Sequence, residues 1–365
     1  MPCISATLFM AAVLTGVGAV GLSLARCGAY GGIAAVLSGT LCALSAATSR
    51  RFQSLAFTLW VLAFGVSAWC YPWLYTWSLR GWEPKQAILP LVQVIMFGMG
   101  VTLTFDDFGR VARMPRAVLI GVVCQYTIMP LAGWTFARTF GLPSEVAAGL
   151  ILIGSCPGGV ASNVIAYLAR ANVALSVTMT ACSTAISPLA TPRLVQALAG
   201  QYVPIDVGEM TAGIFGMILL PVLLGLLGRR YTPRLVQKVT GVLPAAAMFS
   251  ICVIIAITIA LARADLAAVG LSLFGAAVCH NAAGYALGYG AARGLGLDRR
   301  DSRTVALEVG IQNGGMATAL ALNVWNSPAA ALGSAVFGPW SALSSSLLAS
   351  WWRRSGREEK RSRRG

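Results

Sequence analysis

The chain has 365 residues, of which 57% are hydrophobic and only 11% are charged, and its mean hydropathy is +0.74. Several apolar stretches reach 18 residues or more, the length at which a helix crosses a bilayer, so a soluble globular protein is excluded. The formal net charge of +15 would suit a nucleic-acid-binding protein. The basic residues, however, lie in short clusters between the apolar stretches, where membrane orientation explains them better.

The apolar stretches predict an all-α polytopic membrane protein, because the alternating pattern of a membrane barrel is absent. The nine cysteines have no paired spacing, so we expect neither a disulfide framework nor a zinc site. In chain order the predicted segments lie near 5–25, 30–48, 54–78, 88–105, 117–137, 144–168, 172–192, 207–228, 240–262, 266–292, 302–323 and 327–352. The first two form an N-terminal hydrophobic extension, 1–53, which we interpret as two extra spans.

The basic residues test this map. If the side that holds Arg50 and Arg51 is cytoplasmic, 21 of the 27 Lys and Arg residues fall on that side, as the positive-inside rule requires. Both termini are then cytoplasmic, and we expect the basic tail 353–365 to be disordered. The N-terminal residues carry neither a secretory signal nor a transit-peptide pattern, which favours a bacterial inner membrane over a plastid envelope.

Two segments contain related sequences. Residues 154–162 read GSCPGGVAS and residues 310–318 read GIQNGGMAT, so both fit G-x-x-x-G-G-x-A-[S/T] at an offset of 156 residues. Gln125 and Asn281 share this offset, each one span earlier. Because five spans separate the copies, one copy is inverted in the membrane, which is typical of inverted-repeat transporters. The alternative is two glycine-rich helix contacts, since small residues favour close packing.

Both copies predict an interrupted helix. Pro157 lacks an N–H group, and the glycines next to it and next to Asn313 weaken a helix. Unpaired backbone groups at membrane depth are tolerated only when they face protein or a watery cavity. The freed carbonyl groups can bind a cation, while the N-terminus of a half-helix favours an anion.

Glu308 is the only carboxylate inside a long apolar segment. A charge at the centre of the bilayer costs about 2.5–3.5 kcal/mol on insertion scales, which makes Glu308 a candidate functional residue. A stripe of hydroxyl residues runs along the segment 172–192 at steps of three and four residues. Oxygen atoms and a single carboxylate fit sodium better than calcium, which prefers more carboxylates. The predicted shell comprises Ser162, Asn163, Ser176, Thr180 and Glu308. Alternatively, each hydroxyl bonds to its own helix.

Two further polar residues lie within predicted spans. His280, the only histidine, could relay protons, but a hydrogen-bonded packing role is the simpler interpretation. Gln125 could join neighbouring helices or contribute to a binding site, and its relation to Asn281 leaves both interpretations open.

These residues resemble the bile acid:sodium symporter (BASS) family from about residue 54 to 352. The matching stretches are 95–100, 154–163, 167–176, 280–281 and 308–315. The resemblance implies a ten-helix core of two inverted five-helix repeats, 54–200 and 201–352. It also implies panel and core domains, with two broken helices that cross in the core.

The resemblance also implies binding residues. It assigns one sodium ion to Ser162, Asn163, Ser176, Thr180 and Glu308. It assigns a second sodium ion to Gln125, Glu308, Gln312 and the backbone carbonyl groups of Val309 and Ile311. Substrate is expected near Gly158, Gly159 and Asn313, with His280 and Asn281 as further candidates, and near Val160, where some relatives carry Thr.

The function expected from these observations is sodium-coupled symport of an organic anion by alternating access. The alternatives are proton-coupled or facilitative transport, and a membrane sensor that binds solute without moving it. An intramembrane enzyme is disfavoured, because one acid and one histidine form no catalytic constellation. The expected partners are the organic anion, two Na⁺ ions and the bilayer, without nucleic acid, and no protein partner can be inferred.

Overall fold

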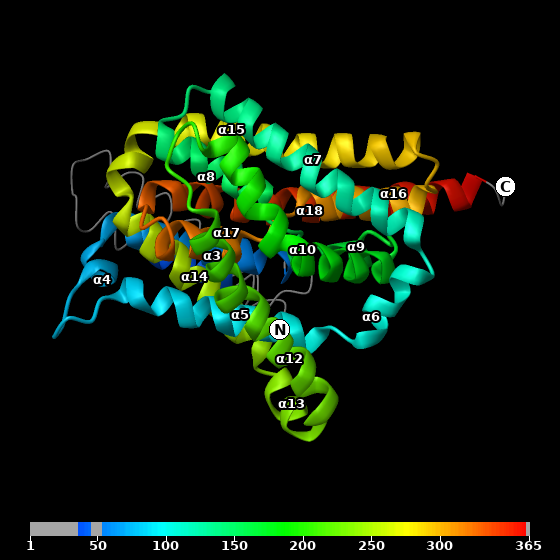
Figure 1. Ribbon diagram of the computed structural model, residues 1–365, viewed down its shortest axis with the longest axis horizontal. Helices are drawn as coiled ribbons and strands as arrows, with labels where there is room; N and C mark the ends of the chain where they lie inside the picture. The colour runs from blue at the N-terminus through cyan, green and yellow to red at the C-terminus, as the bar shows by residue number, and fades with distance from the viewer. Residues whose placement is uncertain (1–35, 45–52, 363–365) are drawn as a thin grey trace. The chain divides into compact units, whose positions relative to one another are not determined.

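The computed structural model describes residues 36–44 and 53–362, so the predicted span near 5–25 lies outside the described residues. Residues 36–44 of the predicted segment 30–48 are helical. The further helices, shown in Figure 1, are α3 (Gln53–Cys70), α4 (Trp73–Thr76), α5 (Ile88–Thr102), α6 (Phe105–Gly109), α7 (Pro115–Thr139), α8 (Ser144–Ser155), α9 (Ala161–Leu168), α10 (Val173–Ala199), α11 (Val207–Ile214), α12 (Leu220–Tyr231), α13 (Pro233–Thr240), α14 (Leu243–Leu261), α15 (Arg263–Gly294), α16 (Arg299–Gly310), α17 (Gly314–Asn323) and α18 (Pro328–Ser362).

Six helices in the described part of the chain are long and apolar enough to cross a membrane. They are Pro84–Thr102, Pro115–Thr139, Val173–Ala199, Val207–Tyr231, Leu243–Leu261 and Arg263–Gly294. The span Val207–Tyr231 joins α11 to α12 through a π-helical turn, Phe215–Leu219. The prediction of a polytopic helical membrane protein is therefore confirmed.

Two predicted spans, 144–168 and 302–323, are each divided into two short helices. α8 ends at Ser155 and α9 begins at Ala161, so the interruption surrounds Pro157. α16 ends at Gly310 and α17 begins at Gly314. The helices are therefore interrupted where Pro157 and the glycine pairs predict it.

Two other boundaries differ from the sequence-based prediction. The predicted span 54–78 is shorter in the structure: α3 ends at Cys70, and α4 is a separate turn whose N-cap is Pro72. The tail expected to be disordered is helical as far as Ser362, because α18 continues into it. Residues 353–362 are rich in Arg, Glu and Lys, which are good helix formers, and only Gly356 among them opposes a helix.

The chain divides into two compact units, Met1–Leu91 with Ala245–Ala267 and Val92–Pro244 with Ala268–Gly365. In the first unit, Ala68 of α3 packs against Ala256 and Ala260 of α14. In the second unit, α7 lies along α8 and α10, and α18 lies along α8 and α17 (Figure 1).

Small residues let the helices of the second unit approach closely. A Cβ atom built on Gly149 of α8 would stand 1.9 Å from the carbonyl oxygen of Ala330 on α18. A Cβ atom on Gly100 of α5 would stand 2.1 Å from the carbonyl oxygen of Val222 on α12. Glycine at these positions allows backbone-to-backbone contact, which is how helices associate where lipid removes the hydrophobic driving force.

Candidate functional site

The two interruptions pair with each other through their backbones. The N–H of Gly159 donates to the carbonyl of Ile311 at 2.9 Å, and the N–H of Asn313 donates to the carbonyl of Pro157 at 3.0 Å. Gly158 and Gln312 thereby form an isolated antiparallel bridge. Four backbone groups that neither helix can satisfy are thus satisfied inside the protein, as non-helical backbone at membrane depth requires.

The crossing leaves no space for side chains at its two glycines. A Cβ atom on Gly158 would lie 2.6 Å from Oε2 of Glu308, and one on Gly159 would lie 2.7 Å from the carbonyl oxygen of Gln312. The second contact is with backbone that cannot move without breaking the bridge. The glycine pair is therefore required by the close approach of the two interrupted helices.

Glu308 lies in the last turn of α16 and is only 2% exposed. Its Oε1 accepts hydrogen bonds from Oγ of Ser162 at 2.5 Å and from Oγ of Ser176. Its Oε2 accepts one from Oγ1 of Thr180 at 3.0 Å. Oδ1 of Asn163 lies 2.8 Å from the Ser176 hydroxyl and 3.5 Å from the Thr180 hydroxyl. The structure therefore brings together all five residues of the predicted oxygen shell, from α9, α10 and α16.

In the part of the chain that the structure describes, no basic side chain forms an ion pair with this carboxylate. Within the described residues the one ion pair joins Arg110 to Asp107, so the charge of Glu308 meets only hydroxyl groups. A buried, unpaired carboxylate is energetically unfavourable, and a bound cation would relieve that cost. The donor set consists of oxygen atoms alone and contains a single carboxylate, which suits a small hard cation. The three hydroxyl groups can rotate to present lone pairs to such an ion.

The rest of the polar stripe on α10 has a different role. The Ser183 hydroxyl donates to the Thr180 carbonyl at 3.2 Å, and the Ser187 hydroxyl donates to the Thr184 carbonyl at 2.8 Å. These two hydroxyls bond to their own helix, which is the alternative that the sequence left open.

The second predicted group of ligands forms a separate network. Nε2 of Gln125 on α7 donates to Oε1 of Gln312 at 2.8 Å, and Nε2 of Gln312 donates to the carbonyl of Val309 at 2.6 Å. The carbonyls of Val309 and Ile311 therefore already accept one hydrogen bond each, which leaves each one further lone pair. Oε1 of Gln125 is buried and has no hydrogen-bond partner. A bound cation could satisfy this buried oxygen atom.

Gln125 and Asn281 hold equivalent ends of the two interrupted helices. Gln125 donates from Nε2 to the carbonyl of Cys156, just beyond α8, at 2.8 Å. Asn281 on α15 donates from Nδ2 to the carbonyl of Gly310, the last residue of α16, at 2.8 Å. Asn281 also accepts from the Ser344 hydroxyl at 2.7 Å. The bonds of Asn281 fix the C-terminal end of α16, so Asn281 is a positioning residue in this structure.

We expect Asn281→Leu to destabilise the protein by about 1–3 kcal/mol, because the substitution keeps the shape but leaves the Gly310 carbonyl without its side-chain donor and removes the hydrogen bond from the Ser344 hydroxyl. Thermal unfolding of the purified protein measures the effect. Ser346→Ala is the control, since the hydroxyl of Ser346 bonds only within its own helix, to the Ala342 carbonyl. Equal melting temperatures for Asn281→Leu and Ser346→Ala would refute the positioning role.

His280 is fully buried among packed helices. Its Nε2 lies 2.9 Å from the carbonyl of Met129, and its ring packs on Phe337 at a centroid distance of 5.3 Å. A Cβ atom on Gly154 would stand 2.9 Å from the ring, so this glycine provides the space that the ring fills. These contacts favour the packing interpretation of His280 over a proton relay or a contact with substrate.

The predicted substrate residues surround the start of the second half-helices. Asn313 caps α17, because its Oδ1 accepts from the N–H of Met316 at 3.0 Å, and it is 5% exposed. Val160 precedes α9 and is half-buried, as are Gly314 and Gly315. Helices α9 and α17 thus both begin at the crossing, and the N-terminus of a helix favours a negative charge.

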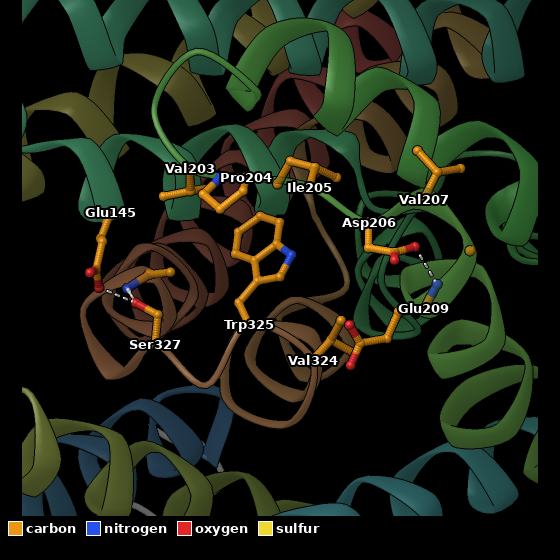
Figure 2. Close-up of a pocket in the computed structure, with 12 residues that line it drawn as sticks. Glu145, Val203, Pro204, Ile205, Asp206, Val207, Glu209, Val324, Trp325 and Ser327 are labelled. Atoms are coloured by element: carbon orange, nitrogen blue, oxygen red, sulfur yellow. Dashed lines mark hydrogen bonds between the residues drawn. The ribbon is translucent and has the colours of Figure 1, made fainter.

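A cavity of about 750 Å³ lies at the far ends of α8 and α17, about 15 Å along the helices from the crossing. Figure 2 shows the indole of Trp325 among its lining residues, which include Glu145 and Asp206. The Ser327 hydroxyl donates to Glu145, and Asp206 caps α11 by accepting from the N–H of Glu209 at 2.9 Å. The sequence did not predict this cavity, because its acids lie at the ends of the predicted apolar segments or between them, where a charge is ordinary.

Comparison with known proteins places the chain in a family. The profile of the Sodium Bile acid symporter family matches residues 89–269. The uncharacterized sodium-dependent transporter YocS of Bacillus subtilis (strain 168) is 39% identical over 302 residues, which cover 83% of this chain and 92% of YocS. The chain belongs to the sodium bile acid symporter family. The probable sodium/metabolite cotransporter BASS1, chloroplastic, of Oryza sativa subsp. japonica is 38% identical over 82% of this chain and 73% of its own length. BASS1 of Arabidopsis thaliana is 36% identical over 83% and 74%.

Membership of the sodium bile acid symporter family confirms the resemblance seen in the sequence. The relatives are named as sodium-dependent transporters or sodium/metabolite cotransporters, and none of these names describes an enzyme. Together with the six apolar helices, they make the chain a multi-pass membrane protein of a sodium-dependent transporter family.

Proposed function

We propose that this protein is a symporter that uses sodium to drive the uptake of a small organic anion. The observation that carries the proposal is the buried carboxylate of Glu308, which has three hydroxyl partners and no basic partner among the described residues. Sodium would neutralise this charge while transport proceeds. Without a cation the buried site carries an unpaired charge.

The proposed sites hold two sodium ions. The first ion binds within the shell of Ser162, Asn163, Ser176, Thr180 and Glu308. The second binds between Gln125, Gln312, Glu308 and the carbonyl groups of Val309 and Ile311. The unpartnered Oε1 of Gln125 supports the second site, and the oxygen-only donor set supports the first.

The anion binds where α9 and α17 begin, near Gly158, Gly159, Val160 and Asn313. The N-termini of two half-helices supply unpaired N–H groups and a positive end of the helix dipole. The proposed cation ligands lie beside the same crossing, since Ser162 is in the first turn of α9 and Glu308 is in the last turn of α16. Because both sites share one backbone junction, there is a physical reason for sodium binding to be coupled to anion binding.

Alternating access follows from two inverted repeats, which we assign to 54–200 and 201–352. The matched roles of Gln125 and Asn281, each holding the end of one interrupted helix, support the repeat. These halves differ from the two compact units, because each unit contains residues from both halves of the chain. The distribution of basic residues supports cytoplasmic termini, and we assign the protein to a bacterial inner membrane.

Uptake into proteoliposomes tests the proposal. We expect carboxylates or sulfates selected by a sodium-dependent thermal-shift screen to enter only with an inward sodium gradient. Uptake should rise when a potassium diffusion potential makes the interior negative. Two Na⁺ ions with one monovalent anion move one net charge, and the potential then contributes about 2.3 kcal/mol per 100 mV.

Other outcomes would contradict sodium symport in distinct ways. Uptake that is unchanged in choline buffer would exclude sodium coupling. Uptake driven by a pH gradient alone would indicate a proton-coupled transporter. Sodium-dependent binding without any flux would indicate a sensor.

A further inference from the structure

Met96 of α5 covers the start of α17, where the anion is proposed to bind. Its side chain is 1% exposed. Nδ2 of Asn313 donates to Sδ of Met96 at 3.9 Å, and a Cβ atom built on Gly315 would stand 3.9 Å from Cε of Met96. These three residues belong to the second compact unit. An anion that binds to Asn313 must therefore touch or displace the thioether.

The hydrogen-bond donors beneath Met96 are poorly satisfied. Asn313 is 5% exposed, and among the described residues the thioether is the only acceptor for its Nδ2. A thioether is a weak acceptor. The N–H of Gly315 lies in the first turn of α17, and the described residues provide no acceptor for it. Because a carboxylate is a much stronger acceptor than a thioether, both donors suit the anionic group of a ligand.

The backbone that carries Met96 is held in place by α12. Gly100 of α5 approaches the backbone of Val222, and a Cβ atom on Gly225 of α12 would stand 2.4 Å from the carbonyl oxygen of Phe97. Close-packed backbone of this kind resists displacement, whereas a methionine side chain is unbranched and has three rotatable bonds. Space for a ligand at the start of α17 therefore comes from movement of the Met96 side chain and is limited by its size.

We propose that Met96 determines which organic anions the protein accepts. This inference rests on the proposed anion site at the start of α17. The anionic group binds to Nδ2 of Asn313 and to the N–H of Gly315, and the body of the anion packs against the displaced thioether. The body is apolar, because a thioether cannot satisfy buried hydroxyl groups, and it is short, because the methionine keeps its volume when it moves. The substrate class is a short aliphatic carboxylate rather than a polyhydroxylated or long-chain acid.

The test is the thermal stability of the full-length protein in sodium buffer, titrated with propionate, hexanoate or gluconate. We expect propionate to stabilise the unmodified protein at lower concentrations than hexanoate, and gluconate, the polyhydroxylated counterpart of hexanoate, to have no effect. Met96→Ala should shift the ratio of apparent affinities toward hexanoate by at least about 10-fold, because the vacated space accepts the longer chain. Met96→Val removes less and should shift the ratio in the same direction by a smaller factor. It takes the place of Met96→Ala if that variant does not fold.

Two further variants are matched controls. Met96→Leu keeps the volume and the apolar character of the side chain, so the ratio should stay that of the unmodified protein. Met99 lies about one turn farther along α5 and is 2% exposed. Met99→Ala therefore reproduces the loss of packing without the loss of the contact to Asn313. A purely structural role of Met96 would lower the stability of both alanine variants and change the ratio in neither.

The role of Met96 is refuted if the ratio is unchanged in Met96→Ala and Met96→Val, or if Met99→Ala changes it equally. A preference of the unmodified protein for hexanoate would refute the size limit, and stabilisation of Met96→Ala by gluconate as strong as by hexanoate would refute the apolar wall. If neither carboxylate stabilised the unmodified protein, the site itself would be refuted. Sodium-driven uptake is read separately in proteoliposomes. Its failure with a shifted ratio contradicts symport alone, whereas its success with an unchanged ratio contradicts only the role of Met96.

Discussion

Glu308→Gln abolishes sodium-dependent uptake in proteoliposomes, with an expected loss of at least about 100-fold, or about 2.8 kcal/mol. The substitution keeps the size of the side chain but removes the only buried negative charge that the proposed sodium ions share. The neighbouring hydroxyls of Ser162, Ser176 and Thr180 can still bond to the amide, so the protein should fold. Sodium should no longer raise its unfolding temperature, which a thermal-shift titration measures directly.

Asp107→Asn is the matched control for this prediction. Asp107 is also a buried acid, 4% exposed, but it caps α6 by accepting from the N–H of Thr104 at 2.7 Å and it pairs with Arg110. We expect this variant to lose stability and to keep its sodium dependence. Full sodium-driven uptake by Glu308→Gln would remove the basis of the proposed coupling. Loss of sodium dependence in Asp107→Asn would show that any buried acid has the same effect.

Gly158→Ala has the second-largest expected effect, a loss of sodium-driven uptake by a factor of 10 or more, which corresponds to about 1.4 kcal/mol or more. The added Cβ atom would lie 2.6 Å from Oε2 of Glu308, so the carboxylate must leave its place. The hydroxyl shell then loses its acceptor, and the apparent affinity for sodium should fall. The concentration of sodium that gives half-maximal uptake measures this change.

Gly290→Ala is the control for the glycine substitution. Gly290 lies within α15, and a Cβ atom there meets nothing within 4 Å. Alanine should leave transport unchanged and should stabilise the helix by up to about 1 kcal/mol. If Gly158→Ala retained the sodium affinity of Gly290→Ala, the packing of the crossing against the carboxylate would not matter for binding.

The interrupted helices and the oxygen shell could be predicted because both violate the rules for a membrane helix. Pro157 and the glycine pairs disrupt a helix wherever they lie, and Glu308 is unfavourable anywhere in lipid. Local composition is sufficient to reveal such residues. The hydroxyl residues on α10 could be placed on one face by periodicity alone, but only three-dimensional contacts separate Ser176 and Thr180 from Ser183 and Ser187.

Features that depend on long-range pairing were not accessible from the sequence. The bridge between Gly158 and Gln312 joins positions far apart in the chain. The role of Asn281 as the residue that holds Gly310 depends on how α15 packs against α16, and hydropathy contains no information on this contact. The cavity around Trp325 and the contact between Met96 and Asn313 likewise form between elements that one-dimensional patterns treat separately.

The bridge at the crossing has a consequence for how such a chain can diverge. Its two hydrogen bonds join main-chain atoms of Gly159, Ile311, Pro157 and Asn313, so they do not depend on which side chain occupies position 311. Side chains that point away from the junction can therefore be substituted while the two main-chain hydrogen bonds are kept. Homologous proteins with this junction can therefore change their substrate specificity through single substitutions, without passing through variants in which the two helices no longer cross.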